Sequence, residues 1–179
     1  MAQSKTLLIV SGGIEAADAA RRAKQMGHTV VVSDRDPHAP GFAFADSCLI
    51  ADVYGPAETA AAAERYNRKI RKIDGVLCVA ADAPVTAATV AQRLRLPGLP
   101  LHVAELACDK LAMKKAFRSA GVAAPWFAEV ATPQELQRIA IARGRDLVIK
   151  PVDSRGSRGV QRVAQVADLT AAFMLARSH

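Results

Sequence analysis

The sequence predicts an α/β protein, a parallel-sheet domain followed by a smaller α+β region. Short apolar runs alternate with stretches whose apolar residues recur at helical spacing. The runs are apolar throughout, which is typical of parallel strands buried on both faces of a sheet. From about residue 101 a long amphipathic stretch replaces this alternation. We therefore expect a doubly wound, Rossmann-like domain over residues 1–100 and a second region over residues 101–179.

The first region contains four predicted strands separated by helices. The strand at 5–10 leads into the turn Ser11-Gly12-Gly13 and a helix that ends at Gly27, a typical helix cap. The remaining predicted elements are strands at 28–34, 47–52 and 75–80, and helices at 56–73 and 83–95. The alanine run at 60–63 is expected on the surface of its helix.

The second region is predicted to mix helices with a hairpin. A single long helix is expected over 101–121, closed by Gly121, and Pro125 then starts an extended segment. The next helix, 132–144, has Thr132 as a plausible N-cap and Pro133 at its first position. Two strand-like arms at 147–152 and 159–163 flank a loop, and a last helix starts at about residue 167.

Composition narrows the class of protein. The chain has 179 residues, 51% of them hydrophobic, which indicates a folded protein. Aromatic residues make up only 4%, without interleaved basic tracts, so we expect no nucleic-acid partner. Apolar runs are far shorter than the roughly 20 residues of a membrane span, so no membrane partner is expected. The three cysteines lie far apart and are read as reduced thiols, and the protein is expected in the cytoplasm.

The basic surplus lies mainly in the second region. Residues 1–100 hold 12 basic and 10 acidic side chains, a surplus of two, whereas residues 101–179 hold 12 and 7, a surplus of five. A basic surplus is consistent with a phosphate-bearing small molecule as ligand.

The segment 147–163, LVIKPVDSRGSRGVQRV, is the most informative part of the sequence. Its glycines allow successive backbone N–H groups to turn inward as an anion site, and Ser154 and Ser157 add hydroxyl donors. No Gly-Lys-Ser/Thr follows and strands flank the loop on both sides, so it is not a Walker A loop. Lys150, on the entering arm, can reach a phosphate beneath the loop.

Two motifs in this order resemble the ATP-grasp superfamily. Ile149-Lys150-Pro151 with the serine and glycine loop up to Gly159-Val160 is similar to its glycine-rich loop, and Asp109-Lys110 about 40 residues earlier is similar to the helix that introduces the fold. The resemblance implies that Lys110 and Lys150 contact ATP phosphates. It also implies a covering loop made of Ser154, Gly156, Ser157, Arg158 and Gly159. The first region is similar to a preATP-grasp domain, which helps to bind an acid or amine substrate.

The same resemblance implies the chemistry. ATP-grasp ligases, including carbamoyl-phosphate-synthase-like and biotin-carboxylase-like proteins, use ATP to activate a carboxylate as an acylphosphate for attack by an amine or similar nucleophile. They need Mg²⁺, whose ligands lie beyond the glycine-rich loop. Here residues 161–179 contain a single acid, Asp168, with no Glu and no Asn. We therefore expect an incomplete ATP-grasp subdomain, Mg²⁺ ligands outside this chain, no assigned catalytic residue or metal ligand, and no turnover by the chain alone.

Other interpretations stay open. Ser11-Gly12-Gly13 with Asp34 would suit an NAD(P)-dependent Rossmann oxidoreductase, although the G-x-G-x-x-G spacing is absent. A non-catalytic ligand-binding or assembly module of the same fold is a further alternative. Asp34, Arg35 and Asp36 are read as a wall of the substrate site. The histidines and cysteines lack metal-ligand spacing, so zinc is not expected. A homo-oligomer is expected, because half of an ATP-grasp fold would expose apolar surface.

Overall fold

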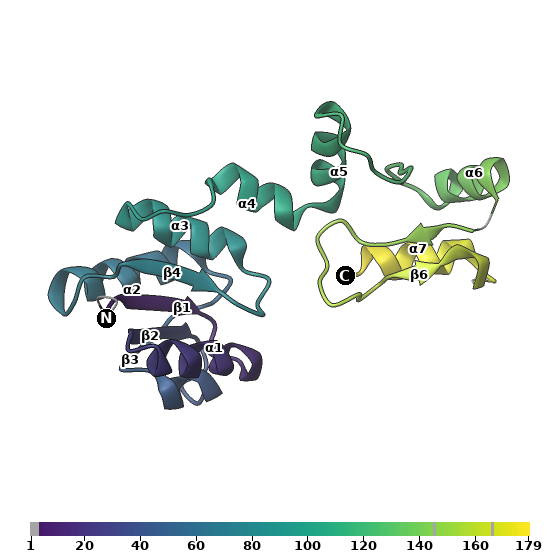
Figure 1. The fold of residues 1–179 in the computed structure, drawn as a ribbon. Helices are drawn as coiled ribbons and strands as arrows, with labels where there is room; N and C mark the ends of the chain where they lie inside the picture. Colours follow the sequence, from purple (N-terminus) through teal and green to yellow (C-terminus); the bar gives the residue numbers. More distant parts are fainter. Residues whose placement is uncertain (1–3, 145, 166) are drawn as a thin grey trace. The chain divides into compact units, whose positions relative to one another are not determined.

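The computed structural model describes residues 4–144, 146–165 and 167–179, which form two compact units (Figure 1). Unit 1 is Met1–Cys108 and unit 2 is Asp109–His179. Each unit has a hydrophobic core of its own.

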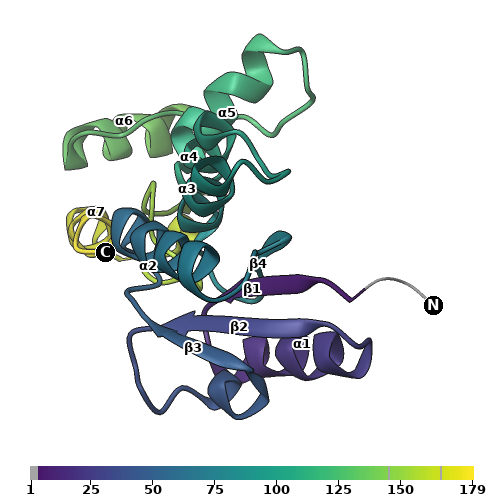
Figure 2. The same ribbon diagram turned by 90° about the vertical axis from the view of Figure 1, so that its left-hand side faces the viewer.

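Unit 1 is built on a parallel sheet with the strand order β3-β2-β1-β4 (Figure 2). Its strands are β1 (Thr6–Val10), β2 (Thr29–Asp34), β3 (Ser47–Ile50) and β4 (Gly75–Cys78). The register pairs Thr6 with Thr29 and Leu7 with Gly75. The connecting elements are α1 (Ile14–Gln25), η1 (Pro40–Phe44), α2 (Pro56–Lys69), α3 (Pro84–Leu94) and α4 (Leu101–Cys108). The prediction of a parallel sheet in an α/β domain is confirmed.

The two faces of the sheet carry separate cores. Successive side chains of a strand point to opposite faces. Leu8 and Val31 therefore pack with α2 and α3 through residues such as Tyr66 and Val90. The opposite face, with Ile9 at its centre, packs against α1. Helices thus cover both faces, as the apolar strands predicted.

The alanine run at 60–63 corrects one prediction. Ala60 and Ala63 are fully buried and Ala62 is 5% exposed, so most of the run lies in the core and not on the helix surface. A methyl side chain allows α2 to approach the sheet and α3 closely. The small side chain of alanine is therefore what permits this close packing of α2.

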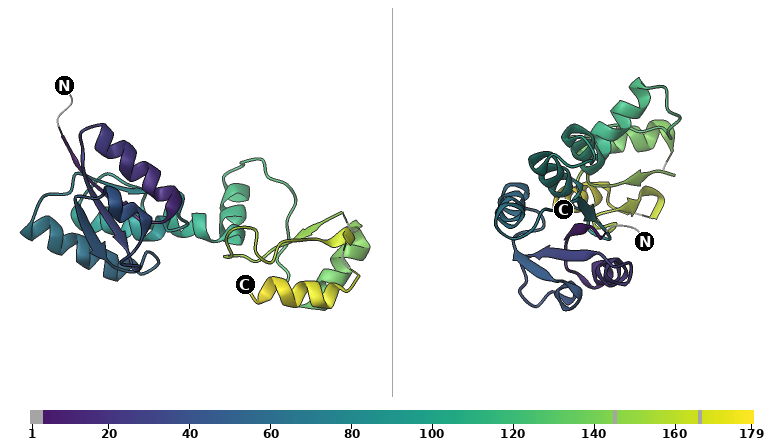
Figure 3. Two further views of the ribbon diagram at one scale, coloured as in Figure 1. Left: turned by 90° about the horizontal axis from the view of Figure 1, so that it is seen from below. Right: turned by 60° about the vertical axis from the view of Figure 1, so that its left-hand side comes forward.

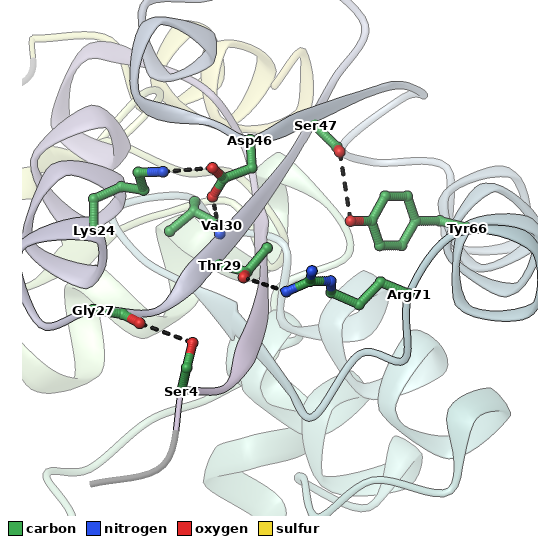
Figure 4. A network of polar contacts seen from close by, with 9 residues as sticks. All are labelled: Ser4, Lys24, Gly27, Thr29, Val30, Asp46, Ser47, Tyr66 and Arg71. Atoms are coloured by element: carbon green, nitrogen blue, oxygen red, sulfur yellow. Dashed lines mark hydrogen bonds and ion pairs between the residues drawn. The ribbon is translucent and has the colours of Figure 1, made fainter. Parts of the chain in front are cut away.

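A polar network stabilises the amino ends of the strands in unit 1 (Figure 4). The Asp46 carboxylate accepts from the Lys24 ammonium at 2.5 Å and from the Val30 backbone N–H at 2.8 Å. The Lys24 hydrogen bond, followed by the Val30 one, lowers the pKa of Asp46 below its ordinary value. Arg71 donates to the Thr29 hydroxyl at 2.9 Å. These contacts join α1, β2 and the segment after α2.

The predicted long helix over 101–121 is wrong, because the chain breaks at Asp109. The structure has α4 up to Cys108 and a new helix, α5 (Lys110–Ser119). Asp109 is extended, with φ −110° and ψ 106°, and its carboxylate accepts from the N–H groups of Leu111 and Ala112 at 2.8 Å. A side chain that satisfies the first free N–H groups of a helix starts a helix there.

Unit 2 continues with α6 (Pro133–Arg143), β5 (Val148–Ile149), β6 (Gln161–Arg162), η2 (Val163–Gln165) and α7 (Leu169–Arg177). β5 and β6 pair antiparallel, so the predicted hairpin is confirmed with shorter strands. The core of unit 2 contains Leu136, Val163 and Phe173. Gln161 also donates from its side chain to the Ala172 carbonyl at 2.9 Å, which holds α7 along the hairpin (Figure 3).

No helix among the described residues combines the length and apolar character that a membrane span needs.

Candidate functional site

The loop from Lys150 to Val160, between β5 and β6, holds most of the predicted site residues. Two consecutive turns shape its tip: Arg158 N–H donates to the Arg155 carbonyl at 3.3 Å, and Val160 N–H donates to the Ser157 carbonyl at 3.2 Å. Gly156 and Ser157 have φ of +60° and +59°. Positive φ at both central residues of the first turn is the pattern of a type I′ turn, which suits a hairpin.

Gly159 closes the loop against its own entering arm. A Cβ at this position would lie 2.8 Å from Cγ of Pro151 and 3.0 Å from Cδ2 of His179. Its φ of +71° is also unfavourable for other residues. Pro151 is buried beneath it. Glycine is therefore required here both by space and by backbone conformation.

Lys110 meets this loop from the start of α5. Its ammonium donates to the Ser154 carbonyl at 2.5 Å and to the Val152 carbonyl at 3.4 Å. Its backbone N–H donates to the same Val152 carbonyl at 2.9 Å. Two segments about 40 residues apart in the sequence, each predicted to bind phosphate, are thus in direct contact.

The other predicted loop side chains mostly contact the loop itself. The Ser154 hydroxyl donates to the Arg158 carbonyl at 3.1 Å, and Nε of Arg158 donates to the Arg155 carbonyl at 3.2 Å. Lys150 is exposed, and no hydrogen bond of its ammonium is found within the described part of unit 2. The loop therefore has three positively charged side chains in or beside it: Lys110, Lys150 and Arg158.

The first turn of unit 1 is closed by contacts within the chain. Gly12 N–H donates to one oxygen of Asp34 at 2.8 Å, and Asp36 N–H donates to the other at 3.1 Å. Gly13 N–H donates to the Ser11 hydroxyl at 3.2 Å. A Cβ on Gly41 would lie 2.9 Å from Cα of Gly12, so η1 packs directly on the turn. The amides and the carboxylate that a dinucleotide would use already have partners.

Known sequence relatives match only part of this chain. No family model matches the chain. The uncharacterized protein y4rH of Sinorhizobium fredii is 30% identical over 106 residues, which is 58% of this chain and 22% of that protein. The D-alanine–D-alanine ligase of Stutzerimonas stutzeri is 33% identical over 82 residues, 46% of this chain and 26% of the ligase. The matches therefore span about a quarter of these relatives.

Solved structures match over nearly the whole chain. The N5-carboxyaminoimidazole synthetase of Staphylococcus aureus has a TM-score of 0.75 at 19% identity, covering 99% of this chain and 46% of that one. The L-amino acid ligase of Bacillus licheniformis has a TM-score of 0.73 at 21% identity, covering 99% and 43%. The carboxyaminoimidazole ribonucleotide synthase of Aspergillus clavatus, complexed with ATP, has a TM-score of 0.78 at 17% identity, covering 98% and 45%.

These matched proteins are ATP-grasp ligases, and the match covers both units. The chain has the fold of the N-terminal part of an ATP-grasp ligase. The resemblance carried by Asp109-Lys110 and by the glycine-rich loop is thereby confirmed for the fold. The chain spans less than half the length of these ligases.

The phosphate roles of the ATP-grasp residues stay predictions, but the geometry suits an anion. Lys110 is held beside the loop, and Gly156 and Ser157 at the tip have the positive φ that is common in loops that bind anions through backbone N–H groups. The described residues contain no group of three His, Cys, Asp or Glu side chains placed to hold a metal ion. No step is therefore assigned to a metal.

The Cys48 and Cys78 thiols are poorly suited to nucleophilic chemistry. Cys48, Cys78 and Cys108 are all free cysteines. Burial raises the pKa of the Cys48 and Cys78 thiols, which favours their neutral form.

The structure also places residues that the sequence did not single out. The Val152 and Ser154 carbonyls that receive Lys110 carry no side-chain signature. A shallow groove of about 490 Å³ lies along α6, where the Arg143 guanidinium stacks on the Trp126 ring at 4.1 Å. These contacts join segments that are separated in the sequence, so they can be identified only from the folded structure.

Proposed function

We propose that this chain supplies the phosphate-binding part of an ATP-grasp ligase that activates a carboxylate as an acylphosphate for attack by an amine. The observation that supports this proposal is the direct contact between Lys110 and the glycine-rich loop at Ser154. The two residues come from the two motifs that resemble the superfamily, and the solved ATP-grasp ligases share the fold.

The proposed roles follow from the chemistry of each residue. Lys150 would place a positive charge against the phosphates as they lie under the loop, and Lys110 would add a second charge from the start of α5. The backbone N–H groups of Gly156, Ser157 and Gly159 would donate to phosphate oxygens, supported by the terminal N–H groups of the Arg158 guanidinium. The Ser154 hydroxyl would join them only by exchanging its hydrogen bond to the Arg158 carbonyl. The chain's own residues therefore bind and orient ATP.

A dinucleotide-dependent oxidoreductase is less well supported. The Gly12 amide and both oxygens of Asp34 are engaged in hydrogen bonds within the chain. A cofactor at this turn would have to displace them, and each unpaired buried group costs about 1–3 kcal/mol. In the described part of unit 2, by contrast, no hydrogen-bond partner is found for the Gly156, Ser157 and Gly159 amides that ATP would use.

We also propose the finer features of the protein. Its substrate would be a small carboxylate or amine bound partly by unit 1, with Mg²⁺ ligands outside this chain and a cytoplasmic location. Because the chain spans less than half of the matched ligases, these 179 residues alone would bind ATP without turning it over. A non-catalytic ligand-binding module would share that behaviour and differ by showing no turnover when the rest of a ligase is supplied.

The test is calorimetric titration of the chain with ATP and Mg²⁺. We expect weak binding that falls at least about tenfold in Lys150→Ala, since one charged hydrogen bond contributes about 1.5–3 kcal/mol. Lys72→Ala, which removes an exposed lysine of unit 1, is the matched control and should bind like the unaltered chain. NADH should give no heat. NADH binding, or ATP binding indifferent to Lys150, would contradict the proposal.

A further inference from the structure

Lys110 holds the glycine-rich loop through main-chain carbonyls. Its ammonium donates to Ser154 O at 2.5 Å and to Val152 O at 3.4 Å, and its backbone N–H also donates to Val152 O at 2.9 Å. Any residue at positions 152 and 154 would offer these carbonyls. The long cationic side chain at position 110 is therefore the specific part of the contact.

The contact falls between the base and the tip of the loop. At the base, Pro151 is buried and packs against Gly159. At the tip, Gly156 and Ser157 are exposed, and Ser157 keeps a positive φ despite having a side chain, which is unfavourable. An unfavourable tip conformation persists only where neighbouring contacts hold it. Lys110 fixes Ser154, just before the tip.

A second contact carries this restraint across the loop. The Ser154 hydroxyl donates to the Arg158 carbonyl at 3.1 Å. Ser154 is thus held on its carbonyl side by Lys110 and holds the returning arm with its hydroxyl. Fixing Ser154 consequently orders both sides of the tip.

We propose that Lys110 is a positioning residue that orders the glycine-rich loop before any nucleotide binds. An ammonium has three N–H donors. Two are directed at the Val152 and Ser154 carbonyls, and the third is left for an anion, so the same residue joins the loop to a phosphate. The link to ATP rests on the proposed function, whereas the positioning of the loop does not.

The test is hydrogen exchange of backbone amides in the nucleotide-free 179-residue chain, followed by mass spectrometry. In Lys110→Met, exchange in the peptide covering residues 153–160 should rise about tenfold, because a charge-assisted hydrogen bond is lost. Lys150→Met removes the same charge from the entering arm of the loop and should leave this exchange unchanged. Lys110→Arg, which keeps a cationic donor, should restore much of the protection.

Other regions of unit 2 separate positioning from general stability. Exchange in α6 and α7 should be the same in Lys110→Met as in the unaltered chain. Unchanged protection of the loop in Lys110→Met would overturn the proposal, and so would an equal rise throughout unit 2. If Lys110→Met does not fold, Lys110→Ala, which also removes the donor and is well tolerated in a helix, is judged by the same criteria.

Nucleotide binding is measured separately on the same variants. Faster exchange of the loop in Lys110→Met supports the positioning role whether or not the unaltered chain binds ATP. A failure of the unaltered chain to bind ATP would count only against the proposed phosphate-binding function. Trypsin gives an independent readout, because it cleaves after Arg155 and Arg158 in the loop. Faster cleavage there in Lys110→Met and not in Lys150→Met is expected.

Discussion

At the scale of single residues, Asp46 links the stability of unit 1 to pH. Lys24 and the Val30 N–H lower its pKa from the ordinary 3.8, so its contribution is complete above that value and is lost as the pH falls through the lower, folded-state pKa. We expect Asp46→Asn to be less stable by about 1 kcal/mol at pH 7, a modest value because the pair is partly exposed. This difference in the free energy of unfolding between Asp46→Asn and the unaltered chain should shrink toward pH 3.

Urea unfolding of both proteins at pH 7 and pH 3 measures this effect. Asp18→Asn is the matched control, because Asp18 forms a more exposed ion pair with Arg21 on α1. The free energy of unfolding of Asp18→Asn should differ little from that of the unaltered chain at either pH. An Asp46→Asn penalty that is equally large at pH 3 would show that the carboxylate charge is not the cause.

Single residues also show what the sequence could and could not predict of the candidate site. Lys110 and Ser154 were both assigned to it, because each belongs to a motif with its own chemistry. The atoms that join them were not predictable, since the Ser154 carbonyl is common to every residue type. Likewise, Asp34 was read as a ribose ligand or a substrate wall, and its bonds to Gly12 and Asp36 depend on how the turn folds.

At the scale of elements, the start of α5 depends on one side chain. Asp109 accepts from the Leu111 and Ala112 N–H groups, so Asp109→Ala should destabilise unit 2 by about 1 kcal/mol, within the usual range of N-cap losses. Asp109→Asn keeps an acceptor and should lose less. Urea unfolding followed by circular dichroism measures both. An alanine variant as stable as the unaltered chain would show that α5 does not need this cap.

The same element shows why the sequence prediction of helices was incomplete. Apolar residues continue at helical spacing across 101–121, and periodicity alone does not record a change of direction at Asp109. Asp109 is an acceptable N-cap residue, but the same Asp-Lys pair also carries the resemblance to a phosphate-binding motif, so the sequence alone does not indicate a helix start there. The buried alanines at 60–63 were misjudged for a related reason, because low hydrophobicity does not reveal that close packing requires a small side chain.

At the scale of the whole molecule, the sequence predicted the fold class but not the strand order. Apolar strands alternating with helices were sufficient for a parallel sheet. The order β3-β2-β1-β4 depends on pairings such as Leu7 with Gly75, which lie far apart in the chain. Among the described residues, three of the four core clusters lie in unit 1 and one lies in unit 2. Most of the buried hydrophobic residues that the structure describes also lie in unit 1, so unit 2 is the less well buried part.

That unequal burial predicts self-association through unit 2. Ile141 is 86% exposed, Val148 60% and Met174 58%, and exposed apolar side chains favour contacts between copies. We expect a dimer or larger oligomer by light scattering at high concentration, with Ile141→Lys shifted toward monomer. Ile70→Lys is the matched control, because Ile70 is 70% exposed in unit 1. A monomer at all concentrations would contradict the prediction, whereas an oligomer unaffected by Ile141→Lys but lost in Ile70→Lys would place the interface on unit 1.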